Sequence, residues 1–284
     1  MKGRPIPGII FIVAIGSTLH RTLRHWRAFV GIYIQDGLAY KASGVIWILT
    51  DAVNAFVMPM VLIAAGKGGA ISGFDPNQIV LYYLVSLLVT CFVTCHFMWE
   101  FAMEIKEGQF STFLLRPTSF LQFMGARNLA WRCVRTMLFL PMFALMLFAY
   151  SAFLDGAVVH ITGPVLLSVL LGHLVSFLTV MALATIALFV QDATSIFELY
   201  YIPMLFLSGQ MFPVAMFPDW AQTLSRWTPF YYTTGFPTEL ALGRIADSQV
   251  WPMLGIQLMW IVLSYFAFRF GMSRGLRHYT GVGM

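Results

Sequence analysis

The sequence predicts an all-α, polytopic membrane protein with six transmembrane helices and both termini in the cytoplasm. Two features of the composition predict the membrane: 59% of the residues are hydrophobic and only 10% are charged, against about 25% charged residues in a typical soluble domain. The third observation is a set of six long apolar runs, each close to the roughly 20 residues that cross a bilayer. They cover about residues 44–65, 79–103, 132–153, 164–190, 194–211 and 250–270. Because these runs fill the chain, we expect one transmembrane domain over residues 1–284 and no soluble domain.

The distribution of positive charge predicts the orientation. With both termini inside, the outer side holds only Lys67, Arg226 and Arg244 of the 17 Lys and Arg residues. Cytoplasmic loops carry the excess of Lys and Arg in membrane proteins, and an odd number of spans would place the basic C-terminal tail outside. We therefore expect a multi-pass protein of the plasma membrane, which is the inner membrane in bacteria. The net charge of +5 reflects this orientation, and we expect no nucleic-acid partner.

Residues 17–36 form an amphipathic stretch ahead of the first span. Its apolar positions recur at helical spacing, and they are Leu19, Leu23, Trp26, Val30 and Ile34. Basic residues lie beside this stripe, which is typical of a helix lying in the lipid headgroup region. A cytosolic helix packed on another protein is the alternative.

A short charged segment, EIKEGQFSTFLLRP at residues 104–117, separates spans 2 and 3. It falls on the cytoplasmic side and opens a predicted cytoplasmic segment over residues 104–124. Its candidate contact residues combine charge, a turn-forming glycine and apolar side chains: Glu104, Lys106, Glu107, Gly108, Phe113, Arg116 and Pro117. A short helix with an exposed apolar face beside charges is typical of a docking element, and an ordinary loop folded back on the bilayer is the alternative.

Residues 212–248 are too interrupted by proline to span a membrane and too apolar to stand in water. Irregular backbone at membrane depth must be buried in protein or line a cavity. We therefore expect a re-entrant pair of short helices, about residues 219–226 and 234–242, that dips from the outer face and closes a path or only covers the spans. The candidate gate residues are Pro213, Pro218, Trp220, Pro229 and Tyr231. Aromatic residues suit the headgroup level, and here they are Trp220, Trp227, Tyr231 and Tyr232.

A few polar residues lie within the predicted spans. Asp51 and Asn54 are in span 1, Glu198 is about one turn into span 5, and Arg132 and Arg135 are at the inner end of span 3. Ionisable residues in a span are costly and usually paired, so the two arginines are candidate partners for the carboxylates. Such residues either clamp helices together or contact a substrate or proton.

The sequence gives little support to catalysis or to a bound cofactor. Its Gly66-Lys67 pair is followed by Gly68, where a phosphate-binding loop has Ser or Thr. A serine protease of the membrane is a weak alternative, because the run 206–209 lacks the first glycine of Gly-x-Ser-Gly. Cys91 and Cys95 share a helix face, but no set of ligands completes a metal site. An energy-independent channel or membrane scaffold stays open as an alternative function.

The order of these parts resembles the membrane subunit of ABC-2 class exporters over nearly the whole chain. The most specific resemblance is a series of short motifs that matches the class pattern of Ser-Gly, Pro, Pro-x-Trp, Pro-x-x-Tyr and Arg. In this chain they are Ser208-Gly209, Phe212-Pro213, Phe217-Pro218-Asp219-Trp220, Thr228-Pro229-Phe230-Tyr231 and Gly243-Arg244. The chain departs at the fourth motif, where Tyr231 is two residues after proline and Tyr232 is three.

The resemblance implies a permease without its own ATPase that forms half of a substrate path. It implies that residues 104–117 contact a separate ATP-binding-cassette ATPase, which binds ATP and Mg²⁺, while this chain binds no cofactor. It also implies pairing with a second permease chain, identical or homologous, within membrane lipids. Spans 1, 2 and 5 of the two chains would then face each other. Substrates across the class range from drugs to lipids and glycans.

Overall fold

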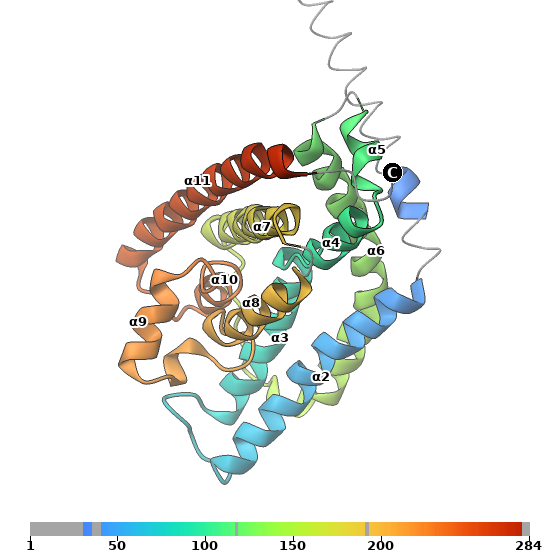
Figure 1. Cartoon of the computed structure of the whole chain (residues 1–284). Coiled ribbons are helices and arrows are strands. Elements are labelled where there is room, and N and C mark those ends of the chain that lie inside the picture. The colour runs from blue at the N-terminus through green and yellow to red at the C-terminus, as the bar shows by residue number, and fades with distance from the viewer. Residues whose placement is uncertain (1–30, 36–40, 117–118, 191–192, 280–284) are drawn as a thin grey trace, which may run out of the picture.

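The computed structural model describes residues 31–35, 41–116, 119–190 and 193–279, and these residues form helices joined by turns and loops, with no β-strand among them (Figure 1). The α-helices are α2 (Lys41–Ala65), α3 (Pro76–Val93), α4 (Met98–Lys106), α5 (Phe110–Leu114), α6 (Phe120–Ala149), α7 (Gly163–Ala184), α8 (Thr194–Leu207), α9 (Asp219–Trp227), α10 (Gly235–Ala241) and α11 (Asp247–His278). Three short 3₁₀ helices are η1 (Ser151–Phe153), η2 (Thr185–Leu188) and η3 (Val214–Met216). The predicted all-α class is confirmed. Most of the predicted interfacial helix at 17–36 lies outside the described residues. The part that the structure describes, residues 31–35, is helical.

Five segments of the described chain are helical, long and apolar enough to cross a membrane: Ile48–Ala65, Pro76–Lys106, Phe120–Ala149, Gly163–Leu188 and Asp247–His278. They correspond to predicted spans 1, 2, 3, 4 and 6. The predicted fifth span is α8, which has 14 residues and is therefore only about 21 Å long, against a hydrocarbon core of roughly 30 Å. The multi-pass architecture is thus clear, while the count of six spans and the cytoplasmic termini stay predictions.

The third long helix begins earlier than predicted. Helix α6 begins at Phe120, whereas the sequence placed the start of the span at Arg132. Ser119 caps α6, because its side chain accepts a hydrogen bond from the backbone N–H of Gln122 at 3.3 Å. The arginines that suggested a boundary lie inside the helix, where Arg132 and Arg135 are buried against other helices. The linker between α4 and α6 is correspondingly shorter than residues 104–124.

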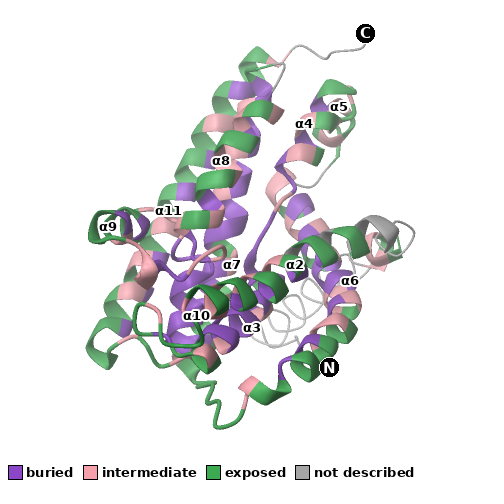
Figure 2. Cartoon of the chain, turned by 90° about the horizontal axis from the view of Figure 1, so that it is seen from below, coloured by how far each residue is buried: buried purple, intermediate pink, exposed green. Residues whose placement is uncertain are grey.

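Helices α3 and α7 lie in the middle of the molecule, with α11 along one side and α2 and α6 along the other (Figure 1). Helix α7 packs along α11, and α3 packs against α2, α6 and α7. Buried residues concentrate on the central helices, while α2, α6 and α11 expose apolar faces (Figure 2). Such faces are what lipid covers in a membrane protein.

The two short helices predicted before the last span are present. Helices α9 and α10 match the predicted segments 219–226 and 234–242 to within one residue at each end. Pro218 is the N-cap residue of α9. Every residue of α10 is buried, whereas α9 lies at the edge of the molecule (Figure 2). The depth of this pair relative to the membrane stays a prediction.

Candidate functional site

The second long span is broken in its middle, and a buried arginine holds the break. Helix α3 ends at Val93 and α4 begins at Met98. The guanidinium of Arg132, on α6, donates hydrogen bonds to the carbonyl oxygens of Cys91 at 2.6 Å and Val93 at 2.9 Å, and to that of Thr94. The last carbonyls of a helix have no partner within the helix. Arg132 therefore supplies the donors that allow α3 to end inside the protein.

Further side chains complete this junction around Cys95. The backbone N–H of Cys95 donates to the hydroxyl of Ser176 on α7 at 3.0 Å, and the amide of Asn128 on α6 donates to the Cys95 sulfur at 3.4 Å. The imidazole Nδ1 of His173 lies 3.3 Å from the carbonyl oxygen of Val93. Non-helical backbone at membrane depth is tolerated where protein groups satisfy it. The break is thus a built polar junction between spans 2, 3 and 4.

Among the charged residues predicted within spans, Arg132 does not pair with a carboxylate of the described chain. The contacts of Arg132 in the described chain are with backbone carbonyls and the Cys95 sulfur, in place of a carboxylate. Arg135 is buried in α6, and Glu198 is exposed on α8. Asp51 lies in α2, and its side chain is outside the described residues. The sequence marked Arg132 only as a charged residue within a span. The structure shows that it donates hydrogen bonds to the backbone carbonyls of span 2.

A cavity of about 360 Å³ lies between α2, α3 and α8, which are the predicted spans 1, 2 and 5. Most of its surface is apolar. Its lining includes Val53, Val57, Met58, Leu87 and Leu205, together with the polar groups Thr50, Asn54, Ser86, Thr90 and Gln210. This size and mixture suit a small or elongated amphipathic molecule, because ligand sites are mostly apolar with a few polar groups that fix orientation.

One end of the cavity is closed by the turn that follows α8. The carbonyl oxygens of residues 209, 210 and 211 accept hydrogen bonds in turn from the Tyr82 hydroxyl at 2.8 Å, the Asn54 amide at 2.9 Å and the Tyr83 hydroxyl at 2.7 Å. Gly209 has φ +81°, and a Cβ there would lie 2.7 Å from the Tyr82 hydroxyl oxygen. Only glycine fits this approach. Three successive bonds therefore hold the end of α8 to α2 and α3.

The predicted gate residues separate into an inward and an outward group. Tyr231 is fully buried, and its hydroxyl donates to Oε2 of Glu239 at 2.6 Å, whereas Trp220 is 71% exposed. The prolines lie at the joints: Pro213 precedes η3, Pro218 precedes α9 and Pro229 follows α9. Tyr231 and Tyr232 do not face outward, because both pack inside the protein against Phe236 of α10; their depth relative to the headgroups stays a prediction.

Glu239 is a buried acid that the sequence analysis did not single out. It lies in α10 with 6% of its surface exposed, and burial raises the pKa of its carboxyl above the ordinary value. Its second oxygen, Oε1, is buried and has no hydrogen-bond partner among the described residues. The available signal was an acidic residue in the otherwise apolar or neutral run 235–242.

The segment between spans 2 and 3 presents some of its predicted residues and buries others. Glu104 lies in α4 and forms an ion pair with Arg127 of α6, so it joins two helices of this chain. Lys106 and Glu107 are exposed, and Glu107 Oε2 accepts a hydrogen bond from the side-chain amide of Gln109 at 2.8 Å. At the turn between α4 and α5, Gly108 has φ +74°, a conformation that favours glycine.

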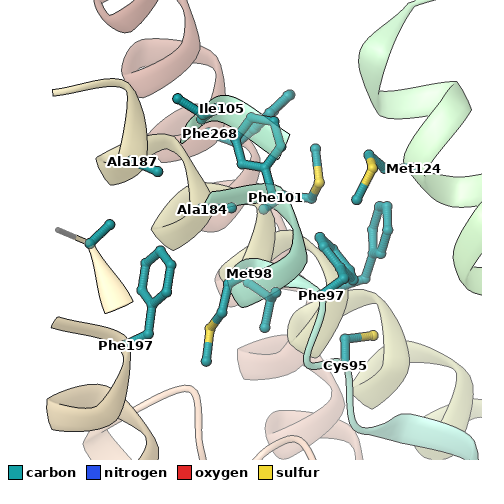
Figure 3. Packing of buried hydrophobic residues seen from close by; sticks show 14 of the residues in the cluster. Cys95, Phe97, Met98, Phe101, Ile105, Met124, Ala184, Ala187, Phe197 and Phe268 are labelled. Atoms are coloured by element: carbon teal, nitrogen blue, oxygen red, sulfur yellow. The ribbon is translucent and has the colours of Figure 1, made fainter. Parts of the chain in front are cut away.

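Helix α5 is fixed on its inner side and free on its outer side. Phe110 is fully buried and packs edge-on against Phe101, Phe120 and Tyr279, with ring centroids 5.2–5.4 Å apart. These rings belong to a core in which side chains of α4 lie among those of α6, α7, α8 and α11 (Figure 3). The hydroxyl of Ser111 lies 2.9 Å from that of Tyr279, beyond the end of α11.

The outer side of α5 carries an exposed apolar tip. Leu114 is 47% exposed and Leu115 is 87% exposed. The guanidinium of Arg116 lies over the ring of Phe113, 4.9 Å from its centroid, and 5.2 Å from that of Phe123. A cation over an aromatic ring is favourable, so Arg116 supports the tip from within the chain. Pro117 lies outside the described residues.

The comparisons with known proteins give a family. The sequence profile described as ABC-2 family transporter protein matches residues 49–283, which is most of the chain. No curated protein and no solved structure matches the chain. The family implies a partnership with an ATP-binding-cassette ATPase subunit. The chain therefore belongs to the ABC-2 transporter family and is a multi-pass membrane transport component.

Proposed function

We propose that this chain is the permease subunit of an ATP-driven exporter and forms half of its substrate path. In this proposal the chain itself has no ATPase activity and binds no cofactor, while the partner ATPase binds ATP and Mg²⁺. A second permease chain, identical or homologous, supplies the other half of the path in the plasma membrane, which is the inner membrane in a bacterium. Family membership supports the transport role, and the geometry of α4 and α5 supports the coupling.

The observation that carries the coupling is the contrast between the two sides of α5. Its inner side is fixed by Phe110, while Leu114 and Leu115 on the other side are 47% and 87% exposed. Exposed apolar surface rimmed by polar residues marks protein contact sites, and the leucine pair at the tip of α5 has this arrangement. Exposed charges flank it at Lys106, Glu107 and Arg116 and would orient the partner.

Movement of this tip would reach the cavity through span 2. Helix α5 packs on α4, and α4 continues through the break into α3, which lines the cavity between α2, α3 and α8. Because the helix is interrupted at residues 94–97, α4 can tilt without bending α3. ATP-driven displacement of α5 would thereby change the cavity while the junction at Arg132 acts as the pivot.

The cavity favours an amphipathic substrate. Its wall is mainly apolar, and its polar groups are hydroxyls and amides. Cavities from two chains that face each other across α2 and α8 would make one path. This arrangement agrees with the exposed apolar side chains on both helices, among them Val53, Val57, Leu199 and Ile202.

The test is to place charge on the apolar tip. The double variant Leu114→Asp with Leu115→Asp should lose co-purification with the ATPase and substrate-stimulated ATP turnover, because an aspartate pair cannot fill an apolar anchor site. Both side chains are exposed, so the variant should keep wild-type expression and a monodisperse elution profile. Glu104 is unsuitable for this test, since its ion pair with Arg127 holds α4 to α6.

The matched control is Leu276→Asp, which alters an exposed leucine near the end of α11. It should keep ATPase binding and transport. Normal transport by the Leu114/Leu115 double variant would refute the coupling role of α5 and favour a channel that needs no ATPase.

A further inference from the structure

Helix α9 exposes an apolar stripe on its outer surface. Trp220, Leu224 and Trp227 are 71%, 46% and 78% exposed. Their spacings of four and three residues place them on one side of the helix, within about 60° of one another at roughly 100° per residue. Two exposed tryptophans are more apolar surface than a helix in water normally shows.

The other sides of α9 are clearly different in character. One side packs on the protein through Ala221 and Ser225, and the amide of Gln222 donates to the carbonyl oxygen of Phe217 at 2.8 Å. The remaining side is polar and exposed, and it consists of Asp219, Thr223 and Arg226. Helix α9 therefore has a protein side, an apolar side and a polar side.

A third exposed tryptophan lies near the same end of the molecule on a different element. Trp251 is 67% exposed and lies about one turn into α11, which begins at Asp247. Trp220, Trp227 and Trp251 are the exposed tryptophans among those whose side chains the structure describes. Its helix is long and apolar enough to cross a membrane, and tryptophan near the end of such a helix is typical of the membrane–water interface.

We propose that α9 lies flat on the extracytoplasmic surface of the plasma membrane, with Trp220, Leu224 and Trp227 inserted at the boundary between lipid headgroups and acyl chains. Tryptophan is enriched at this boundary, where its ring is apolar and its N–H is polar. An amphipathic helix binds there with its polar side toward water, and Arg226 on that side suits lipid phosphate. This placement makes α9 an interfacial anchor. Of the two short helices, only α10 is then enclosed by the protein.

The position of α9 in the membrane does not depend on coupling to an ATPase. It is tested by nitroxide labels on α9 in the full chain, reconstituted in phosphatidylcholine–phosphatidylglycerol vesicles. The labelled variants are Trp220→Cys and Trp227→Cys on the apolar side and Arg226→Cys on the polar side as the matched control. Cys133→Ser serves as the background, since Cys91 and Cys95 are buried. Collision rates with oxygen report apolar surroundings, and those with a water-soluble nickel chelate report water.

The labels at 220 and 227 should collide several-fold more with oxygen than with nickel, and the label at 226 should show the reverse. Leu224→Cys keeps both tryptophans and should behave like 220 and 227, which guards against a variant that loses its anchor. Equal ratios on both sides would place α9 in water and overturn the proposal. Low collision rates with both reagents at 220, 224 and 227 would show that protein covers the stripe, such as a second copy of the chain, and would equally overturn it.

Discussion

Replacing Arg132 with methionine removes the donors that hold the break in span 2. The guanidinium serves the carbonyl oxygens of Cys91, Val93 and Thr94, and methionine has similar length but no donor. A hydrogen bond to a charged group contributes about 1.5–3 kcal/mol. The low end applies here, because methionine also removes a costly buried charge. Three bonds at about 1.5 kcal/mol give a loss of roughly 4–5 kcal/mol, a large fraction of the 5–15 kcal/mol that typically stabilises a folded protein.

Thermal unfolding in detergent would measure this loss, with a dye that fluoresces on reaction with thiols. All variants carry Cys133→Ser, because Cys133 is only partly buried; the remaining thiols, Cys91 and Cys95, are buried beside the break, so the dye reports their exposure. Arg132→Met should lower the unfolding midpoint strongly, and Arg132→Lys should fall between it and the wild type, because lysine keeps the charge but not the forked geometry. Arg269→Met, at an exposed position of α11, should have little effect. A wild-type midpoint for Arg132→Met would show that the carbonyls are satisfied without the arginine.

Three further predictions concern the packing and titration of buried residues. In Gly172→Ala the new Cβ would lie 2.7 Å from the carbonyl oxygen of Thr233, whereas nothing lies within 4 Å of a Cβ at Gly255. Gly172→Ala should therefore lose about 1–3 kcal/mol of unfolding free energy through overpacking, and Gly255→Ala should be neutral or gain up to about 1 kcal/mol. Chemical denaturation measures both changes. Tyr231→Phe removes the hydrogen bond to Glu239 and should cost about 1–3 kcal/mol. Burial raises the pKa of the Glu239 carboxyl, so the folded state binds the proton more tightly than the unfolded state. Wild-type stability should therefore fall as the pH rises from the ordinary carboxyl pKa through the raised pKa of the folded state. A flat stability profile between these two pKa values would contradict this reasoning.

The sequence predicted the helices well because each depends on local composition. Apolar runs located all the long helices, and prolines with intervening polar residues located α9 and α10. The break in span 2 was not predicted, because residues 94–97 carry no glycine or proline and the break is stabilised by Arg132, which is distant in the chain. The same arginine explains why the predicted start of the third span was wrong, because a charged residue in an apolar run also indicates the end of a span.

The candidate site was predicted in outline and misassigned in detail. Residues 104–117 hold the exposed tip, but Glu104 faces Arg127, and a sequence does not show which charges of a segment find internal partners. Tyr231 and Tyr232 have the aromatic character of headgroup residues, yet they are buried, while Trp220 is exposed. Side-chain chemistry alone does not separate these outcomes, because they depend on the angle at which α9 and α10 meet the bundle.

The three hydrogen bonds to the carbonyls of residues 209–211 have a consequence for how a passage can open. They tie α8 to α2 and α3 at one end of the cavity, so these three helices form a single rigid wall there. A cargo cannot leave by parting α8 from its neighbours without breaking all three bonds together. In the proposed pair of permease chains, release at that end would come from two such walls moving apart, at the seam between the chains.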